Sequence, residues 1–413
     1  MDLIIGAGVT GISYANFTPN ECLIIEASDS PGGYCKTIKR NGFVWDYSGH
    51  FFHFRFPEIE KMVCKNIPPA DLRHVEKHTQ ILYGDKYIDF PFQKNIHQLD
   101  KEDFIDCLYD LFNPDLDNEP STFKEMIYSK LGRSIGEKFL IPYNEKLYAC
   151  DLNKLDMDAM GRFFPKASPE EIIRNFKQAG NDSYNATFTY PQGGAIQYID
   201  SLMANRDTPI IYNSEITKID LKNKTAFSAD GRSFKYDRLI STMPLPHLLE
   251  ISNIDFNHED FTCNKVFVFN LGFDKKGTDK INSWVYIPSK EFIFYRIGYY
   301  DNILNTDRLS LYIEIGMKED AEIPPEKELL NRVLTDLKKA GIIDDSHKLV
   351  DYETVLMNPA YVHINKRSNK AVEKYKKILA QNDVYSIGRY GSWIYCSIED
   401  NILEAKTLAD QLK

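Results

Sequence analysis

Short apolar runs alternate with helical patterns at both ends of the chain. The pattern predicts a buried strand, a tight glycine turn, a short helix and a second buried strand at residues 3–5, 6–11, 12–17 and 22–27. Near the C-terminus it predicts a strand at 384–388 and a helix from about residue 399. Because strands that alternate with helices are typical of a parallel sheet covered by helices, the two ends of the chain predict one discontinuous α/β domain.

The middle of the chain changes from helical to strand-rich patterning. Residues 100–180 contain few strand signals, and helical periodicity there covers 101–112, 121–131 and 168–178, with Ser168 as an N-cap. Beyond this stretch the pattern predicts a helix at 196–204, short strands between 209 and 242, further strands at 264–272, 283–288, 292–297 and 309–315, and a helix at 325–340.

We therefore predict an α/β protein with a Rossmann-like nucleotide-binding domain, an inserted helical region and a mixed or antiparallel β-sheet substrate domain. The predicted bounds are 1–90, 186–250 and 380–413 for the discontinuous nucleotide-binding domain, 100–180 for the helical insertion and 255–375 for the β-rich substrate-binding region. A chain of 413 residues has the length for this organisation, since it corresponds to two or three domains of about 150 residues.

Composition narrows the classes of function. Hydrophobic residues make up 43% of the chain, which excludes a disordered or fibrous protein. The net charge of −10 disfavours general binding of nucleic acid, and an anionic ligand would need a local cluster of Arg or Lys. The cysteines show no CxxC or zinc-like spacing, so we predict reduced thiols and no metal site. No apolar run approaches the roughly 18 residues of a transmembrane segment and no signal peptide pattern is present, so we expect a cytoplasmic protein.

The glycine turn near the N-terminus has the pattern of a dinucleotide-binding site. The segment GAGVTG supplies Gly6, Gly8 and Gly11 between the first strand and the first helix. The first two glycines let the backbone turn tightly and approach a pyrophosphate, and the third lets the helix pack on the sheet. Glu26 ends the second strand, where its carboxylate would accept hydrogen bonds from ribose hydroxyls.

Further segments indicate which dinucleotide binds. Gly32 and Gly33 follow the second strand, and a glycine pair at this place resembles FAD-binding proteins of the amine-oxidase and glutathione-reductase type rather than NAD dehydrogenases. Ile216, in EITKID, resembles the strand whose backbone holds the adenine. Gly388 and Arg389, in SIGRYG, resemble the late glycine loop over the flavin phosphates. We therefore expect FAD as the cofactor, although the glycine pair alone would also suit an ordinary turn.

Six segments carry a more specific resemblance. They are DYSGHFF (46–52), FPFQKNI (90–96), FLIPYNEKLYA (139–149), NATFTYPQGG (185–194), the pair WVYIP and FYR (284–288 and 294–296), and GRYGSWIY (388–395). In this order they resemble segments of the UDP-galactopyranose mutase family, most closely its eukaryotic-type branch, within the FAD-dependent amine-oxidase-like superfamily. The resemblance touches every third of the chain.

The resemblance implies a set of functional residues. Arg162 and Arg296 fall where the family holds the substrate diphosphate, a group that Arg side chains bind well. Gly49 and His50 fall at positions whose residues lie against the flavin ring in the family. We therefore expect His50, with the two arginines, to be catalytic. Further substrate contacts are implied at Phe92, Gln93, Asn144, Tyr148, Asn185, Tyr286, Tyr361 and Tyr395. Each type of residue also has a structural alternative, such as a surface cation, a core aromatic or a buried histidine.

The chain also departs from the family pattern. Tyr148 replaces a tryptophan, Phe90 replaces a tyrosine of the eukaryotic branch, and His53 replaces an aromatic residue. After Tyr395 the chain reads CSIEDNI, which lacks an Asn-Gln pair that normally touches the flavin. The resemblance therefore specifies the reaction class better than the exact sugar or base.

The implied activity is a flavin-dependent isomerase that interconverts pyranose and furanose forms of a UDP-galactose-like nucleotide sugar. Its galactofuranose product is a building block of cell-surface polysaccharides, and an external reductant such as NAD(P)H would keep the FAD reduced. In the implied reaction, N5 of reduced flavin attacks the anomeric carbon while the nucleoside diphosphate leaves. Two alternatives stay open: an FAD-dependent oxidoreductase of the amine oxidase or protoporphyrinogen oxidase type, and a flavin-containing binding protein without turnover. The oligomeric state is open as well.

Overall fold

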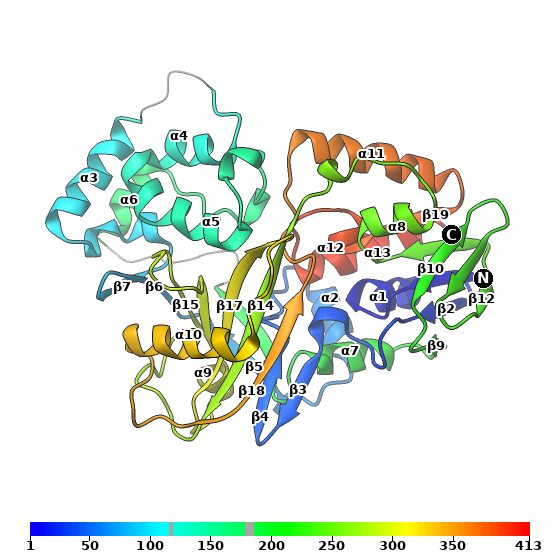
Figure 1. Cartoon of the computed structure of the whole chain (residues 1–413), viewed down its shortest axis with the longest axis horizontal. Helices are drawn as coiled ribbons and strands as arrows, with labels where there is room; N and C mark the ends of the chain where they lie inside the picture. The colour runs from blue at the N-terminus through cyan, green and yellow to red at the C-terminus, as the bar shows by residue number, and fades with distance from the viewer. Residues whose placement is uncertain (115–118, 178–185) are drawn as a thin grey trace.

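The computed structural model of the chain describes residues 1–114, 119–177 and 186–413, which are organised around a parallel sheet and a larger mixed sheet (Figure 1). The strands of the parallel sheet are β1 (Asp2–Ile5), β2 (Cys22–Ile25), β9 (Ile210–Ile211), β13 (Arg238–Ser241) and β19 (Val384–Ser386). They lie in the order β19–β13–β1–β2–β9, on the right of Figure 1. Strands from both ends of the chain therefore pair in one sheet, as the pattern predicted.

Helices cover both faces of the parallel sheet, which explains why its strands are apolar on both sides. The helices of this half are α1 (Val9–Phe17), α2 (Pro57–Cys64), α7 (Ile196–Met203), α8 (Leu245–Ile251), α11 (Lys366–Ala380) and α13 (Ile398–Gln411). Ile4 packs with side chains of α1, α7 and α13, whereas Leu3, on the opposite face, packs with those of α8 and α11. A small antiparallel sheet joins β10 (Ile216–Asp220), β11 (Thr225–Ser228) and β12 (Ser233–Lys235).

The mixed sheet forms the centre of the other half. Its strands are β6 (Thr79–Tyr83), β7 (Lys86–Asp89), β14 (Asn264–Phe273), β15 (Trp284–Tyr286), β16 (Arg296–Tyr299), β17 (Ser310–Lys318) and β18 (Leu349–Met357). They lie in the order β18–β14–β17–β16–β15–β6–β7, and β6 pairs with β15 in parallel while the other described neighbours are antiparallel. Helix α10 (Glu326–Lys339) covers one face, where Leu329 and Val333 pack with Phe269.

A helical insertion covers the opposite face of the mixed sheet, at the upper left of Figure 1. It contains α3 (Lys101–Phe112), α4 (Phe123–Ile135), α5 (Ile141–Tyr148) and α6 (Pro169–Asn175). Ser168 caps α6 in a reciprocal pair with Glu171, as its position in the sequence predicted. Two antiparallel ribbons, β3 (Thr37–Arg40) with β4 (Phe43–Asp46) and β5 (Leu72–Glu76) with β8 (Thr187–Pro191), complete the sheet structure described here.

One predicted strand is wrong in its position. The expected strand at 292–297 is irregular at first, and the regular strand β16 starts four residues later. The reason is that backbone groups of residues 293 and 294 bind side chains instead of a neighbouring strand. The Ile293 N–H donates to Asp336, and the Phe294 carbonyl accepts from Lys146. Backbone pairing with the neighbouring segments begins only at Tyr295.

The topology also changes two of the predicted domain bounds. Residues 79–89, assigned by pattern to the nucleotide-binding domain, form β6 and β7 of the mixed sheet. Residues 366–375, assigned to the β-rich region, lie in α11, which packs against β19 of the parallel sheet. The pairing of β6 with β15 joins segments about 200 residues apart, so local patterning carries no sign of it. Helix α11 ends shortly before β19, so the nucleotide-binding half begins earlier than the predicted residue 380. The other domain bounds stay a prediction.

A buried carboxylate connects the ribbons to both sheets. Asp46, at the end of β4, is fully buried and accepts hydrogen bonds from Thr37 Oγ1 (2.5 Å), the Tyr190 hydroxyl (2.7 Å) and the Ala195 N–H (3.0 Å). Its backbone carbonyl accepts from the Asn270 side chain of β14 at 2.9 Å. Burial raises the pKa of Asp46 to about 7, against the opposing effect of its hydrogen-bond donors.

We predict that Asp46→Asn flattens the pH dependence of stability between about pH 4 and pH 7. Because the folded-state pKa lies above the ordinary value near 4, the protonated carboxyl stabilises the fold below pH 4, and this contribution is lost as pH rises through 7. The contribution amounts to at most about 4 kcal/mol. Asparagine stays neutral, so the free energy of unfolding measured in urea should increase for the variant relative to wild type as pH rises from about 4 to about 7. Parallel stability curves for the two proteins would contradict the prediction.

Candidate functional site

A cavity of about 1200 Å³ lies where the two sheets and the helical insertion meet. Its lining includes Gly6, Gly8, Glu26, Gly32 and Gly33 from the nucleotide-binding half, Tyr286, Arg296 and Glu314 from the mixed sheet, and Tyr143 and Asn144 from α5. The volume exceeds the roughly 300–1,000 Å³ of common small-molecule sites. One continuous space therefore has room for a large cofactor and a second ligand.

Glycine backbones form part of the wall of this cavity. Gly8 and Gly33 face each other, so that a Cβ built on Gly33 would lie 3.5 Å from the Gly8 Cα. Gly8 is also the N-cap of α1, and no side chain accepts a hydrogen bond there. The first N–H groups of the helix thus lie at the cavity wall, which suits the pyrophosphate of a dinucleotide.

Two other glycines act through packing. A Cβ on Gly6 would lie 2.3 Å from Thr242 Oγ1, and one on Gly11 would lie 2.1 Å from the Gly6 carbonyl oxygen. Gly11 does not line the cavity within the described residues, in agreement with its predicted role in seating the helix on the sheet. Gly6 both lines the cavity and packs against Thr242, and its predicted approach to a pyrophosphate stays a prediction.

The acidic residue at the end of β2 also lies at the wall. Glu26 accepts hydrogen bonds from the N–H groups of Ala7 (2.7 Å) and Ser28 (2.9 Å). Ile216, the predicted adenine-side residue, lines the same end of the cavity. Gly388 does not line the cavity within the part of the chain that the structure describes. A Cβ there would lie 2.8 Å from Thr10 Oγ1, so this glycine permits close packing instead.

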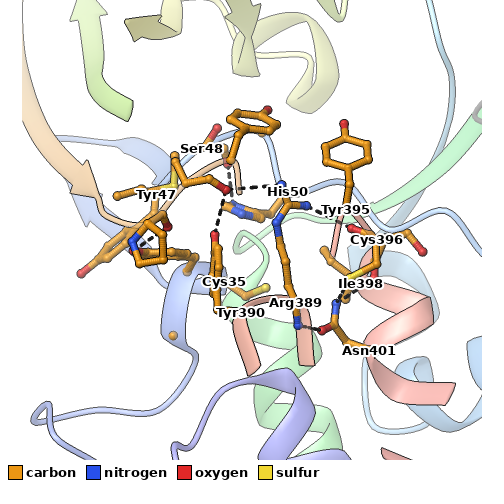
Figure 2. A pocket seen from close by; sticks show the side chains of 18 of the residues that line it. Cys35, Tyr47, Ser48, His50, Arg389, Tyr390, Tyr395, Cys396, Ile398 and Asn401 are labelled. Carbon is orange, nitrogen blue, oxygen red and sulfur yellow. Dashed lines mark hydrogen bonds between the residues drawn. The ribbon is translucent and has the colours of Figure 1, made fainter. Parts of the chain in front are cut away.

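The segment that follows β4 brings His50 to the cavity. Gly49 lies so close to Tyr312 that a Cβ would come within 2.5 Å of its hydroxyl oxygen. His50 Nδ1 lies 3.2 Å from the Ser48 carbonyl oxygen, which can only accept, so Nδ1 carries the proton. Burial lowers the pKa of His50 to about 4. The imidazole is therefore neutral near pH 7, with Nε2 as an acceptor (Figure 2).

Arg296 reaches the cavity from the first position of β16. Its guanidinium binds Glu314 of β17 through two contacts, Nε to Oε2 at 2.5 Å and Nη2 to Oε1 at 2.7 Å. Ser48 donates its hydroxyl to the same carboxylate. Burial favours the neutral form of Glu314, but the charge of Arg296 outweighs it and lowers the pKa of this carboxyl. Glu314 alone holds the Nε–Nη2 edge of the guanidinium, and Nη1 lies on the other edge.

Sequence analysis missed Glu314. The sequence feature that could have indicated it is a single acidic residue within the apolar strand LSLYIEI. Such an acid can be buried if an opposite charge lies on a neighbouring strand. The register confirms this arrangement, because Glu314 is the direct neighbour of Arg296. Tyr143 was missed as well, although it precedes the predicted Asn144. Its ring centroid lies 5.0 Å from that of Tyr286.

A second half-buried arginine lies among tyrosines. Arg389, in α12 (Gly388–Gly391), has its guanidinium carbon 5.3 Å from the ring centroid of Tyr361 and 4.9 Å from that of Tyr395. Figure 2 shows it reaching between His50 and Tyr395. Its Nη1 donates to the Cys396 carbonyl at 3.0 Å. Within the described residues no carboxylate pairs with Arg389, so its charge suits an anionic ligand.

Arg162 lies at the edge of the cavity, in the short turn Gly161–Phe163 of the insertion. Its Nη2 donates to Asp400 at 2.6 Å and to Ser397 Oγ at 3.2 Å, both at the start of α13. The predicted diphosphate arginine thus bridges the insertion and the nucleotide-binding half. Asn185, predicted to contact the same ligand, lies outside the residues that the structure describes.

The remaining predicted substrate residues divide into two groups. Tyr286 and Asn144 line the cavity, as do the two tyrosines beside Arg389. Phe92, Gln93 and Tyr148 do not line it within the described residues. Phe92 stacks on Phe139 behind the wall, Gln93 donates to a backbone carbonyl, and Tyr148 is buried. These three lie behind the lining in this structure, and their direct contact with a substrate stays a prediction.

Neither a metal-binding cluster nor a membrane-spanning helix is present within residues 1–114, 119–177 and 186–413. These residues contain no group of three His, Cys, Asp or Glu side chains arranged to hold a metal ion. In the same ranges, no helix has the length and apolar character needed to cross a membrane.

Three solved structures share this fold. Reduced UDP-galactopyranose mutase matches with a TM-score of 0.91 and 22% identity, over 100% of this chain and 93% of that one. A structure provisionally assigned as a protoporphyrinogen oxidase from Exiguobacterium sp. 255-15 matches with 0.79 and 16%, over 100% and 98%. A fatty acid isomerase from P. acnes that produces CLA matches with 0.69 and 14%, over 99% and 98%. At these identities the matches establish the fold.

A family comparison adds the class of cofactor. Residues 18–361 match the family described as flavin containing amine oxidoreductase, which is most of the chain. The glycine wall, the uncapped start of α1 and Glu26 provide the cradle that a flavin dinucleotide requires. The chain therefore belongs to the flavin-containing amine oxidoreductase family.

Proposed function

We propose that the protein is an FAD-dependent mutase that interconverts the pyranose and furanose forms of a nucleotide-activated sugar, UDP-galactose-like in its chemistry. The observation that carries the proposal is the cationic end of the cavity. Arg389 is half-buried beside two tyrosines without a carboxylate partner among the described residues, and Arg296 presents a second guanidinium. Arginine forks and tyrosine hydroxyls bind diphosphates well, and an amine substrate would be repelled there.

In this proposal the chain's own residues bind and orient the nucleotide sugar. Arg296 and the rim residue Arg162 hold the diphosphate, so that it stays close after it leaves the sugar. We assign Arg389 to the same group instead of to the flavin phosphates, because it lies beside Tyr361 and Tyr395. The hydroxyls of Tyr361 and Tyr395 add hydrogen bonds at the same place. FAD, when bound in its reduced form, supplies an electron-rich nitrogen nucleophile toward the anomeric carbon.

The neutral histidine has a positioning task in the same scheme. His50 keeps its Nδ1 proton on the Ser48 carbonyl, so its Nε2 accepts a hydrogen bond from a flavin or sugar group. Since its pKa is lowered to about 4, this acceptor stays available across the physiological pH range. An external reductant such as NAD(P)H would maintain the cofactor, and we propose action in the cytoplasm.

A second candidate is an FAD-dependent oxidoreductase of the amine oxidase or protoporphyrinogen oxidase type. The family match and the Exiguobacterium structure favour it, because both share the fold. Such an oxidoreductase would bind FAD in the same glycine cradle. This candidate gives no role to the half-buried arginines and the tyrosines at the far end of the cavity. The two candidates differ in the redox state in which the enzyme acts.

FAD as the cofactor is tested at the glycine wall. Gly8→Val should fold but carry little FAD, because the new side chain would fill the space against Gly33 where the pyrophosphate lies. The measurement is the flavin absorbance and the FAD released on denaturation, per mole of protein. Gly84→Asn, in an open surface turn, is the control and should keep full flavin content. A wild-type protein without flavin would contradict the assignment.

Diphosphate binding is tested at the buried fork. Arg296→Lys keeps the charge opposite Glu314 but loses the bidentate geometry, so affinity for UDP should fall roughly 10- to 100-fold, the scale of one or two charged hydrogen bonds. Titration calorimetry on the flavin-loaded protein measures this. Arg174→Lys, at an exposed i,i+4 pair, is the control and should bind UDP as wild type does.

The reaction class is tested by the redox requirement. Enzyme reduced once with dithionite under anaerobic conditions should convert UDP-galactose or a related nucleotide sugar through many turnovers, while oxidised enzyme should be inert. Product analysis separates pyranose from furanose forms. An oxidase would instead show flavin reduction by an amine and a need for oxygen in every cycle. That behaviour, with no isomerisation of any nucleotide sugar, would establish the second candidate.

A further inference from the structure

A half-buried lysine of α5 uses all three of its N–H donors on one connection of the mixed sheet. Lys146 Nζ lies 2.9 Å from the Ile287 carbonyl oxygen, 2.8 Å from that of Ser289 and 2.5 Å from that of Phe294. An ammonium group has three donors, so these contacts satisfy it completely. Ile287 and Phe294 are fully buried, and their carbonyl groups have no access to water.

The three carbonyls belong to both arms of the connection between β15 and β16. Ile287 directly follows Tyr286, and Phe294 lies two residues before Arg296. Both Tyr286 and Arg296 line the cavity. The ammonium therefore bridges the two arms of the connection at the loop end of the hairpin that carries these two site residues. An interstrand hydrogen bond from the Ile287 N–H to the Tyr295 carbonyl lies beside it.

Lys146 is itself held in place from the helical side. It follows Tyr143 and Asn144 by less than one turn of α5, and both of these line the cavity. The backbone of Lys146 lies against Gly316 of β17, where a Cβ would come within 2.0 Å of the Lys146 carbonyl oxygen. The helix thus cannot shift on the sheet without a clash or the loss of the three hydrogen bonds.

We propose that Lys146 is a positioning residue, which fixes the hairpin carrying Tyr286 and Arg296 against the helix carrying Tyr143 and so sets the width of the diphosphate end of the cavity. This inference rests on the proposed function, since it assigns the positioned groups to a nucleoside diphosphate.

The chemistry of the site supports positioning over simple stabilisation. Burial lowers the pKa of Lys146 to about 7, which means that its charge is costly where it lies. Replacing a buried ion by an apolar side chain of similar size is often neutral or stabilising, so stability alone gives little reason for a lysine here. Three converging carbonyls, in contrast, need a group with three donors.

A nearby surface pair provides a matched control. Lys290 lies on the same connection and binds Glu145, the neighbour of Lys146, at 2.9 Å. It links the same helix to the same connection, but the Lys290 side chain is 71% exposed. Lys290→Met therefore removes a cation between the two elements without touching the buried carbonyls.

The experiment compares UDP affinity and flavin content of holoenzyme carrying Lys146→Met, Lys146→Arg or Lys290→Met. We expect Lys146→Met to keep its flavin and weaken UDP binding at least tenfold, Lys146→Arg to recover part of that loss, and Lys290→Met to change binding less than twofold. In the Arg296→Lys background the Lys146→Met loss should shrink to threefold or less, because the geometry that the lysine protects is already gone. Rescue by arginine keeps the test valid if the methionine variant folds poorly.

Three outcomes would overturn the inference. UDP binding by Lys146→Met within twofold of wild type would show that the contacts do not set the site. An unchanged loss in the Arg296→Lys background, or an equal loss in Lys290→Met, would show a merely structural effect. If wild-type holoenzyme itself binds no UDP, the proposed function fails and the inference fails with it.

Discussion

The architecture depends on one buried carboxylate that draws distant segments to a single point. Asp46 receives hydrogen bonds from the ribbon strand β3, from β8 and from the start of α7, while its backbone binds a side chain of β14. Those segments belong to the parallel half, the mixed sheet and the ribbons between them. A carboxylate without access to water tolerates this position only when such donors surround it. The junction therefore orders the chain that leads directly to Ser48, Gly49 and His50.

The cavity beyond this junction changes character along its length. One part of its wall is made of backbone and small residues, because the backbones at Gly8 and Gly33 approach each other. Another part carries two half-buried guanidinium groups with different partners. Arg296 is neutralised by Glu314, whereas Arg389 rests on aromatic rings without a carboxylate among the described residues. The first arginine is held in a fixed orientation, and the second contributes the uncompensated charge that attracts an anion.

This division explains how a common fold hosts different reactions. The cradle for a flavin dinucleotide lies in the parallel half and needs little beyond glycines, a helix start and one acid. The groups that distinguish one substrate from another lie on β15, β16, β17 and α5, across the cavity from that cradle. The fold therefore defines the family, and the far wall carries the chemistry on which the proposed mutase activity rests.

The sequence by itself determined the parallel sheet, the glycine cradle and several residues of the cavity wall. Gly6, Gly8, Gly11, Gly32 and Gly33 are recognisable because each serves the local backbone, and local backbone needs are written in neighbouring residues. For the same reason the capped start of α6 was predictable from Ser168.

Only the tertiary structure decided which side chains face the cavity and what holds them there. Glu314, Tyr143 and Lys146 act through partners far away in the chain, and no pattern of neighbouring residues encodes such a pairing. The same limit explains why Phe92 and Tyr148 were expected at the ligand and lie behind the wall. The sequence around an aromatic residue is the same whether its side chain contacts the ligand or lies behind the wall. Its burial depends on how separate elements pack.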